Sequence, residues 1–146
     1  MTFKPIAILR SRYHPTVSEG LYLGALRALS EEGWGKDSVE TFEAPGAFEM
    51  PVLASELGRT GRYSGVVCLG CVIKGDTAHF EFISAGAALG IQTAAIESRT
   101  PIAFGVLTTY TEDQALFRAR DDGENKGREA ARACARAVKE LARIRG

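Results

Sequence analysis

The residues best suited to chemistry lie in residues 70–82, with the sequence GCVIKGDTAHFEF. After an apolar run, Gly75 allows a tight turn, and Asp76 and Thr77 open a helix. The unpaired backbone amides and the dipole at a helix start attract anions. We expect Asp76 to cap this helix with its carboxylate turned away from any anion. On this motif alone, a capped helix start is a better interpretation than a phosphate site.

His79 follows in the first turn of the same helix. The positive end of the helix dipole favours the neutral imidazole, which a general base working near neutral pH requires. The alternative is a hydrogen-bonded histidine flanked by Phe80 and Phe82, which is the commoner role of a lone histidine.

Other turns between strands and helices carry weaker candidates. Tyr13 could stack on a planar ring or pack as a loop aromatic. Phe48 and Glu49 could supply an apolar wall and a carboxylate, or form an ordinary helix start. Arg118 could hold an oxyanion in a bidentate fork, although a lone surface arginine is commoner, and Lys126 has the same ambiguity.

Strand and helix patterns alternate from end to end, which is typical of an α/β domain. Residues 66–73 are continuously apolar, as in a central parallel strand covered on both faces. The other expected strands are 6–9, 38–42 and 101–107, and the expected helices are about 16–33, 51–58, 77–95, 111–119 and 125–144. We therefore predict a flavodoxin-like three-layer α/β/α sandwich with a mostly parallel four-stranded sheet. Phe104 lies within a strand and belongs to the core by default.

Three details of the helices are also predicted. Thr16 and Ser18 are candidate caps of the first helix. Gly86 and Gly90 share a face of the third helix and indicate a close approach to another backbone. The last helix has a basic stripe that we interpret as a solvated face, formed by Arg128, Arg132, Arg136, Lys139 and Arg143.

Composition narrows the class of protein. The 146 residues are 45% hydrophobic, enough for the core of a single domain spanning residues 1–146. Lysine plus arginine equals aspartate plus glutamate at 18 each, so no net charge draws the chain to nucleic acid or to a membrane. Cys68 and Cys71 form a CxxC inside an apolar run and are expected to be buried thiols. No signal peptide is apparent, so we expect a cytoplasmic protein.

Five stretches together resemble one family, the 6,7-dimethyl-8-ribityllumazine synthases. They are APGAFEMP at 44–51, GCVIKGDTAHFEF at 70–82, PIAFGVLTT at 101–109, QALFRA at 114–119 and ENKGREAA at 124–131. They occur in family order over nearly the whole chain. The combination of PGAFE with Gly-Asp-Thr-x-His is specific in a way that no single turn is.

The resemblance implies an activity without a cofactor or a metal. The family are transferases of riboflavin biosynthesis that condense 5-amino-6-(D-ribitylamino)uracil with 3,4-dihydroxy-2-butanone 4-phosphate, releasing phosphate and water. Imine formation, phosphate elimination and ring closure are all proton transfers, so one placed histidine and a phosphate cradle suffice.

The resemblance also implies roles for single residues. It implies an acid/base at His79 with Glu129 close to it. It implies contacts with the pyrimidine and ribityl groups at Tyr13, Ala47, Phe48, Glu49, Val72, Ile73 and Phe104. It implies phosphate contacts at Asp76, Thr77 and Arg118. Phe104 and Lys126 match positions that the adjacent subunit contributes.

The partners implied are the two small-molecule substrates, further copies of the chain in a homopentamer or an icosahedral shell of pentamers, and riboflavin synthase. Some positions depart from the family pattern. His14 stands where asparagine is usual, and Cys71 where alanine or threonine is common. The acidic link at residues 120–124 replaces a segment that influences how pentamers pack.

Two alternatives remain at this stage. A paralogue could bind flavin or lumazine without turnover, although retention of both His79 and Arg118 argues against it. A generic flavodoxin-like nucleotide-binding or signalling domain lacks support, because the sequence has neither a glycine-rich phosphate loop of the GxGxxG or Walker type nor the acidic pocket of a phospho-receiver.

Overall fold

The computed structural model describes residues 2–146, which contain one four-stranded sheet with all strands parallel. The strands are β1 (Ile6–Arg10), β2 (Val39–Glu43), β3 (Gly65–Ile73) and β4 (Ile102–Thr109). Their order is β2-β1-β3-β4, so β2 and β4 are the outer strands. The sheet predicted to be mostly parallel is entirely parallel in this part of the chain.

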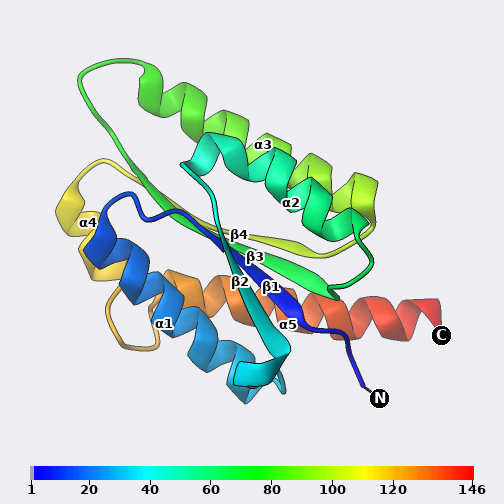
Figure 1. Cartoon of the computed structure of the whole chain (residues 1–146). Coiled ribbons are helices and arrows are strands. Elements are labelled where there is room, and N and C mark those ends of the chain that lie inside the picture. Colours follow the sequence, from blue (N-terminus) through cyan, green and yellow to red (C-terminus); the bar gives the residue numbers. More distant parts are fainter. Residues whose placement is uncertain (1) are drawn as a thin grey trace.

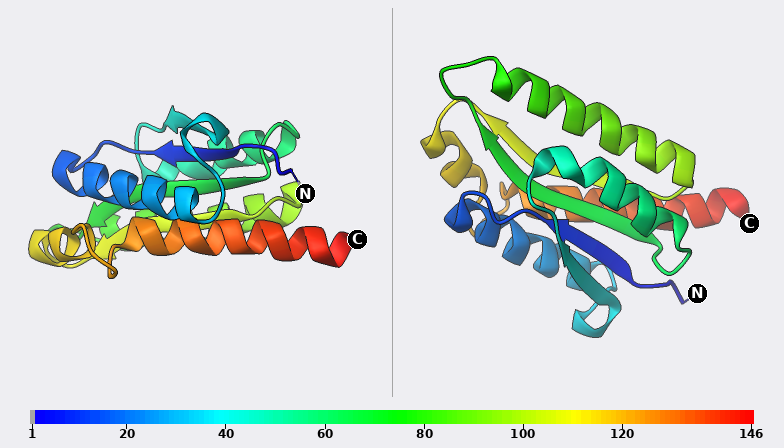
Figure 2. Two further views of the ribbon diagram at one scale, coloured as in Figure 1. Left: turned by 90° about the horizontal axis from the view of Figure 1, so that it is seen from below. Right: turned by 45° about the horizontal axis from the view of Figure 1, so that its top comes forward.

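Five α-helices cover the two faces of the sheet (Figure 1). One layer consists of α1 (Pro15–Glu31), α4 (Glu112–Arg118) and α5 (Lys126–Arg145). The other layer consists of α2 (Met50–Arg59) and α3 (His79–Ser98). The right-hand view of Figure 2 shows the same separation, with α3 on the upper side of the sheet and α5 behind it. The predicted flavodoxin-like three-layer α/β/α architecture is therefore confirmed.

The inner strands are buried on both faces. Ile6 and Ile8 of β1 pack in the layer of α1 and α5, whereas Ala7 and Leu9 pack in the layer of α2 and α3. Side chains of β3 divide between the two layers in the same way. Each fully buried leucine or isoleucine stabilises the fold by about 1.5–3 kcal/mol. The cover on both faces of β3 confirms the interpretation of residues 66–73 as a central parallel strand.

Close packing of α1 on α5 fixes where α5 begins. A Cβ at Gly127 would overlap the backbone of Leu21, and a Cβ at Gly24 would overlap the side chain of Asn125. Asn125 is buried, and its Nδ2 donates to the carbonyl oxygen of Gly20 at 3.0 Å. Its Oδ1 accepts from the backbone N–H of Arg128 at 2.9 Å, so the same side chain also caps α5.

The basic stripe of α5 is not a simple solvated face, which corrects the prediction. Glu31 and Glu32 at the end of α1 accept hydrogen bonds from its side chains. The N–O distances lie between 2.9 and 3.2 Å, and the donors are Arg128 and Arg132 for Glu31, and Arg136 and Lys139 for Glu32. The periodicity identified the polar face but did not show that a neighbouring helix end meets it.

The expected caps of α1 are also wrong. The residue before the helix is His14, whose backbone is left-handed at φ 57°, and no side chain caps the helix start within the described residues. Thr16 and Ser18 lie inside the first turn. Ser18 is buried, and its hydroxyl donates to the carbonyl oxygen of Ser11 at 2.6 Å. A proline at position 15 begins the helix instead, because its fixed φ suits the first helical position.

The three cysteines are buried as free thiols, as expected for Cys68 and Cys71. Within residues 2–146 no group of three or more histidine, cysteine, aspartate or glutamate side chains is placed to hold a metal ion. None of the helices in that range is long and apolar enough to cross a membrane.

The contact of Glu32 with α5 predicts a pH-dependent stability. Hydrogen bonds from Lys139 and then Arg136 hold the pKa of Glu32 below its ordinary value of 4.5. A lowered folded-state pKa stabilises the fold above the unfolded-state value, and that contribution is lost as the pH falls through the folded-state value. We therefore expect Glu32→Gln to lower the free energy of unfolding at pH 7 by about 0.5–1 kcal/mol. Below pH 4.5 the difference from the wild type should shrink.

Urea unfolding of both proteins at pH 7 and at successively lower pH measures this difference. Glu97→Gln is the matched control, because the pair of Glu97 with Arg59 is longer, at 3.6 Å, and exposed on both sides. A Glu32→Gln protein whose stability ran parallel to the wild type at every pH would contradict the assignment.

Candidate active site

A cavity of about 620 Å³ opens at the carboxyl ends of β1 and β3. Chain connections leave these two neighbouring strands in opposite directions across the sheet, because β1 leads to β2 and β3 leads to β4. Open parallel sheets bind ligands at such a switch point. The cavity is lined by Tyr13, His14, Gly46, Ala47, Phe48, Glu49, Cys71, Val72, Ile73, His79 and Ile83.

One wall comes from the loop between β1 and α1. The side chain of Tyr13 is 69% exposed, so little in the described chain covers its ring. The ring of His14 meets it edge to face, with centroids 5.9 Å apart. Asparagine and histidine both tolerate the left-handed backbone of position 14 better than most residues, so His14 suits a position where the family usually has asparagine.

A second wall comes from the turn after β2. Ala47–Glu49 form a single 3-10 turn directly before α2. The ring of Phe48 lies over α3, where a Cβ added at Gly86 would come within 2.7 Å of it. The glycines of α3 thus approach side chains, Phe48 at Gly86 and Pro51 at Gly90, rather than the backbone that the sequence suggested. Glu49 is exposed and lines the cavity.

His79 lies at the remaining side of the cavity as the first residue of α3. Its side chain is exposed, and its backbone N–H donates to the hydroxyl oxygen of Thr77 at 3.3 Å. The predicted position in the first helical turn is confirmed. An exposed imidazole facing a cavity that contains an aromatic ring and a carboxylate can donate or accept protons on a bound ligand.

The turn before α3 differs from the prediction. The residue preceding the helix is Ala78, which has no capping side chain, so the expected cap at Asp76 is wrong. The side chain that accepts from the first backbone N–H of the helix is that of Thr77. Asp76 and Thr77 are exposed and lie outside the cavity lining. Lys74 and Glu81 form an ion pair of 3.0 Å across the turn, and this hydrogen bond lowers the pKa of Glu81.

The remaining predicted residues line a second hollow, of about 370 Å³, between β4 and α5. Phe104, Arg118, Lys126 and Glu129 all lie there. Lys126 pairs with Glu129 at 2.8 Å, and Arg118 Nη1 donates to the carbonyl oxygen of Gln114 at 3.0 Å. The ring of Phe104 is 41% exposed, which corrects its assignment to the core. Because β4 is an outer strand, this hollow lies beside a sheet edge that no described strand pairs with.

One chain therefore divides most of the predicted site residues between two hollows, and Asp76 and Thr77 line neither. Tyr13, His79 and the residues from 47 to 49 and 72 to 73 share the first, whereas Phe104, Arg118, Lys126 and Glu129 share the second. Glu129 and His79, expected to be neighbours in the family's site, line different hollows in one chain.

The cavity also contains residues that the sequence analysis did not assign to a site. His14 and Cys71 had been noted only as departures from the family, and Ile83 had not been singled out. Burial, and to a smaller extent the charge of Glu112, raises the pKa of Cys71 to about 11, so this thiol stays protonated near neutrality. The sequence offered one signal that could have assigned His14 to the site, namely its position next to Tyr13 in a turn between a strand and a helix.

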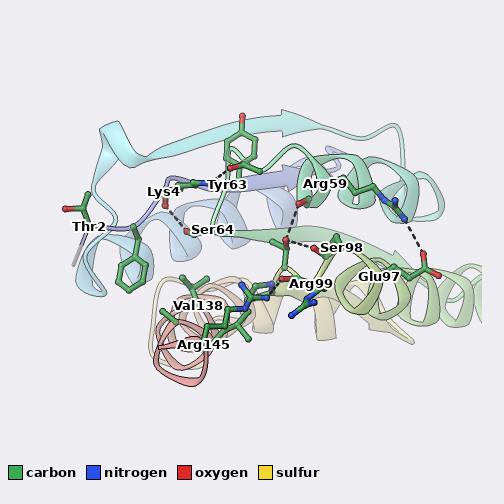
Figure 3. A pocket seen from close by; sticks show the side chains of 17 residues that line it. Thr2, Lys4, Arg59, Tyr63, Ser64, Glu97, Ser98, Arg99, Val138 and Arg145 are labelled. Carbon is green, nitrogen blue, oxygen red and sulfur yellow. Dashed lines mark hydrogen bonds and ion pairs between the residues drawn. The ribbon is translucent and has the colours of Figure 1, made fainter.

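A larger hollow, of about 870 Å³, lies instead at the amino-terminal ends of the strands (Figure 3). Three of its four cationic side chains have partners within the described chain, the exception being that of Arg99. Arg145 donates to the carbonyl oxygen of Arg99 at 2.9 Å, Lys4 donates to that of Gly61, and Arg59 pairs with Glu97. Cations commonly bind the unpaired carbonyls at helix ends, so these contacts stabilise chain ends and turns.

Taken together, the sheet and the cavity at its switch point are those of an α/β protein with a candidate small-molecule site beside a histidine. The family model described as 6,7-dimethyl-8-ribityllumazine synthase matches residues 4–142. The chain belongs to the 6,7-dimethyl-8-ribityllumazine synthase family.

Curated relatives agree with this assignment. A protein of Caulobacter vibrioides named 6,7-dimethyl-8-ribityllumazine synthase 1 is 58% identical over 140 residues, covering 96% of this chain and 92% of the relative. The 6,7-dimethyl-8-ribityllumazine synthase of Deinococcus deserti is 42% identical, covering 94% and 88%. That of Salinibacter ruber is also 42% identical, covering 87% and 81%.

Proposed function

We propose that the whole chain acts as one lumazine synthase domain. It condenses 5-amino-6-(D-ribitylamino)uracil with 3,4-dihydroxy-2-butanone 4-phosphate to 6,7-dimethyl-8-ribityllumazine, releasing phosphate and water, in riboflavin biosynthesis. The observation that carries the proposal is the cavity at the switch point, where His79 at the start of α3 faces Tyr13 and Glu49 in a chain of this family.

The first cavity is the proposed site of the pyrimidine substrate. The exposed ring of Tyr13 stacks on the pyrimidine, because two flat π-systems in contact bury apolar area at low entropic cost. The ribityl chain lies along Ala47 and Glu49, and the Glu49 carboxylate accepts hydrogen bonds from its hydroxyl groups. Phe48, Val72 and Ile73 supply the apolar walls.

The turn before α3 and Arg118 bind the phosphate in this proposal. Thr77 offers a hydroxyl group, and the start of a 20-residue helix supplies backbone amides and a dipole. Asp76 contributes through its backbone, because its carboxylate would repel the phosphate. Arg118 neutralises the charge of the leaving group through a bidentate contact.

His79 carries the protons in each step. Attack of the amine on the ketone, loss of water, elimination of phosphate and ring closure each require a proton to move between neighbouring atoms. A single imidazole held beside both substrates can accept and return these protons. Holding the two substrates together supplies a large further part of the rate enhancement.

An activity assay tests this proposal. With the two substrates and no added metal or nucleotide, the wild-type protein should form a fluorescent lumazine faster than the uncatalysed mixture does. His79→Ala should lower kcat by about 100-fold, because it removes the proton carrier. Arg118→Ala should mainly raise the KM for the phosphate substrate, by about tenfold, because a charge-assisted contact is lost.

Arg62→Ala is the matched control for Arg118→Ala, because Arg62 is exposed and lies outside both proposed hollows. Circular dichroism of each variant checks the fold. Product formation by the wild type at only the uncatalysed rate would show that the chain is not an active synthase.

We further propose that the chain forms a homopentamer in which neighbours share each site. An apolar stripe on α3 supports self-association, because Phe82, Leu89 and Ile96 recur every seven residues and are 67–73% exposed. In this arrangement Phe104, Arg118, Lys126 and Glu129 of one chain complete the cavity of the next, which would bring Glu129 to His79. An icosahedral shell, riboflavin synthase as a partner and a cytoplasmic location stay predictions of the sequence analysis.

Mass measurement in solution tests the pentamer. The wild type should have a mass of about 79 kDa or a multiple of it, against 15.7 kDa for one chain. Leu89→Glu places a charge in the stripe and should shift the population toward smaller species, because an unpaired buried charge is costly.

Leu23→Glu is the control, because Leu23 is 57% exposed on α1 and lies outside the stripe. A wild-type mass that corresponds to one chain would overturn the shared site. Equal dissociation of the Leu89→Glu and Leu23→Glu variants would show that the stripe is not part of the interface.

A further inference from the structure

A buried arginine lies directly beneath the loop that carries Tyr13. Arg10 is the last residue of β1 and is only 4% exposed. Its Nη2 donates to Ser18 Oγ at 3.2 Å and lies 3.1 Å from Glu19 Oε2. Its Nε is buried without a hydrogen-bond partner in the described chain. Burying a guanidinium group costs free energy. Packing alone therefore does not explain why an arginine lies here.

The guanidinium group is held by side chains of α1, one of which is tied to β2. It stacks on the ring of Tyr22, with 4.3 Å between Cζ and the ring centroid. The hydroxyl groups of Tyr22 and Thr41 are hydrogen-bonded at 2.9 Å, which ties the stack to β2. Glu19 holds it from α1. Lysine could supply the charge but neither the planar stack nor the forked donors.

A relay of hydrogen bonds leads from Arg10 to Tyr13. Ser18 accepts from Arg10, and its own hydroxyl proton goes to the carbonyl oxygen of Ser11 at 2.6 Å. The backbone N–H of Ser11 donates to the carbonyl oxygen of Leu69 on β3 at 2.9 Å. Its hydroxyl oxygen accepts from the backbone N–H of Tyr13 at 3.3 Å.

The carboxyl-terminal end of this loop is held by the first turn of α1, which also contains Ser18. The carbonyl oxygen of His14 accepts from the backbone N–H of Ser18 at 2.9 Å. Arg10 and Ser18 therefore hold the segment from Ser11 to His14 at both of its ends, whereas the Tyr13 ring itself is exposed.

We propose that Arg10 is a positioning residue for the pyrimidine substrate, acting through Ser18 and Ser11 to hold Tyr13 at the cavity. This inference rests on the proposed function, since it requires Tyr13 to bind the pyrimidine. Arg10 touches no substrate. Its loss leaves His79 and the phosphate contacts in place, so it weakens binding of one substrate and not of the other.

The test is a comparison of both KM values and kcat for Arg10→Gln, Arg10→Lys, Ser18→Ala and Tyr13→Ala. Arg10→Gln and Ser18→Ala should raise the KM for the ribitylaminouracil by about tenfold, because small displacements of a binding group have large effects. The KM for the butanone phosphate should change less than about twofold, and kcat should fall less than the pyrimidine KM rises. Arg10→Lys should recover part of the loss, because it keeps the pair with Glu19.

Arg27→Gln is the control, since Arg27 pairs with Asp121 on the surface and should change neither KM. Ser18→Ala carries the test if Arg10→Gln fails to fold, because it removes a single hydroxyl group. Unchanged KM values, or an equal loss for both substrates, would overturn the inference.

Failure of the inference is distinguishable from failure of the proposed function. An inactive wild type would reject the function itself. An active wild type whose pyrimidine KM responds to Tyr13→Ala but not to Arg10→Gln or Ser18→Ala would reject only the role of Arg10.

Discussion

The whole site depends on the unequal lengths of two parallel strands. β1 ends at Arg10, opposite Leu69, whereas β3 continues to Ile73 and pairs there with β4 alone. Residues 70–73 therefore have no paired strand on the side where β1 ends. The loops that follow β1 and β2 surround this side, and the backbone N–H of Ala44 donates to the carbonyl oxygen of Arg10 at 2.9 Å. A cavity results without any strain in the sheet.

The outer position of β4 has a second consequence. The side chains of β4 and α5 that resemble the family's site face a hollow at the sheet edge, separate from the cavity with His79. Neither hollow alone contains all the groups that the proposed reaction needs, namely a proton carrier, a stacking ring and an arginine for the phosphate. Sharing a site between chains makes activity depend on assembly, because the geometry of each site is then set by an interface.

Much of this arrangement could be predicted from the sequence, because it depends on local patterns. The apolar run of β3, the alternation of strands and helices and the place of His79 at a helix start follow from periodicity and turn chemistry. The caps at Ser18 and Asp76 were wrong, since a left-handed His14 and an uncapped Ala78 precede the helices instead. The contact of Glu32 with α5 joins segments distant in the chain, and the burial of Arg10 depends on how α1 packs against β1, so no pattern within one element encodes either.

Mixing two impaired chains is the most direct test of a site shared between neighbours. His79→Ala lacks the proton carrier of one hollow, and Arg118→Ala lacks the phosphate contact of the other. If neighbours share each site, chains mixed at random by co-expression should recover about a quarter of the wild-type activity at limiting phosphate substrate, because one interface in four joins two intact hollows. A mixture no more active than the separate variants would contradict the account.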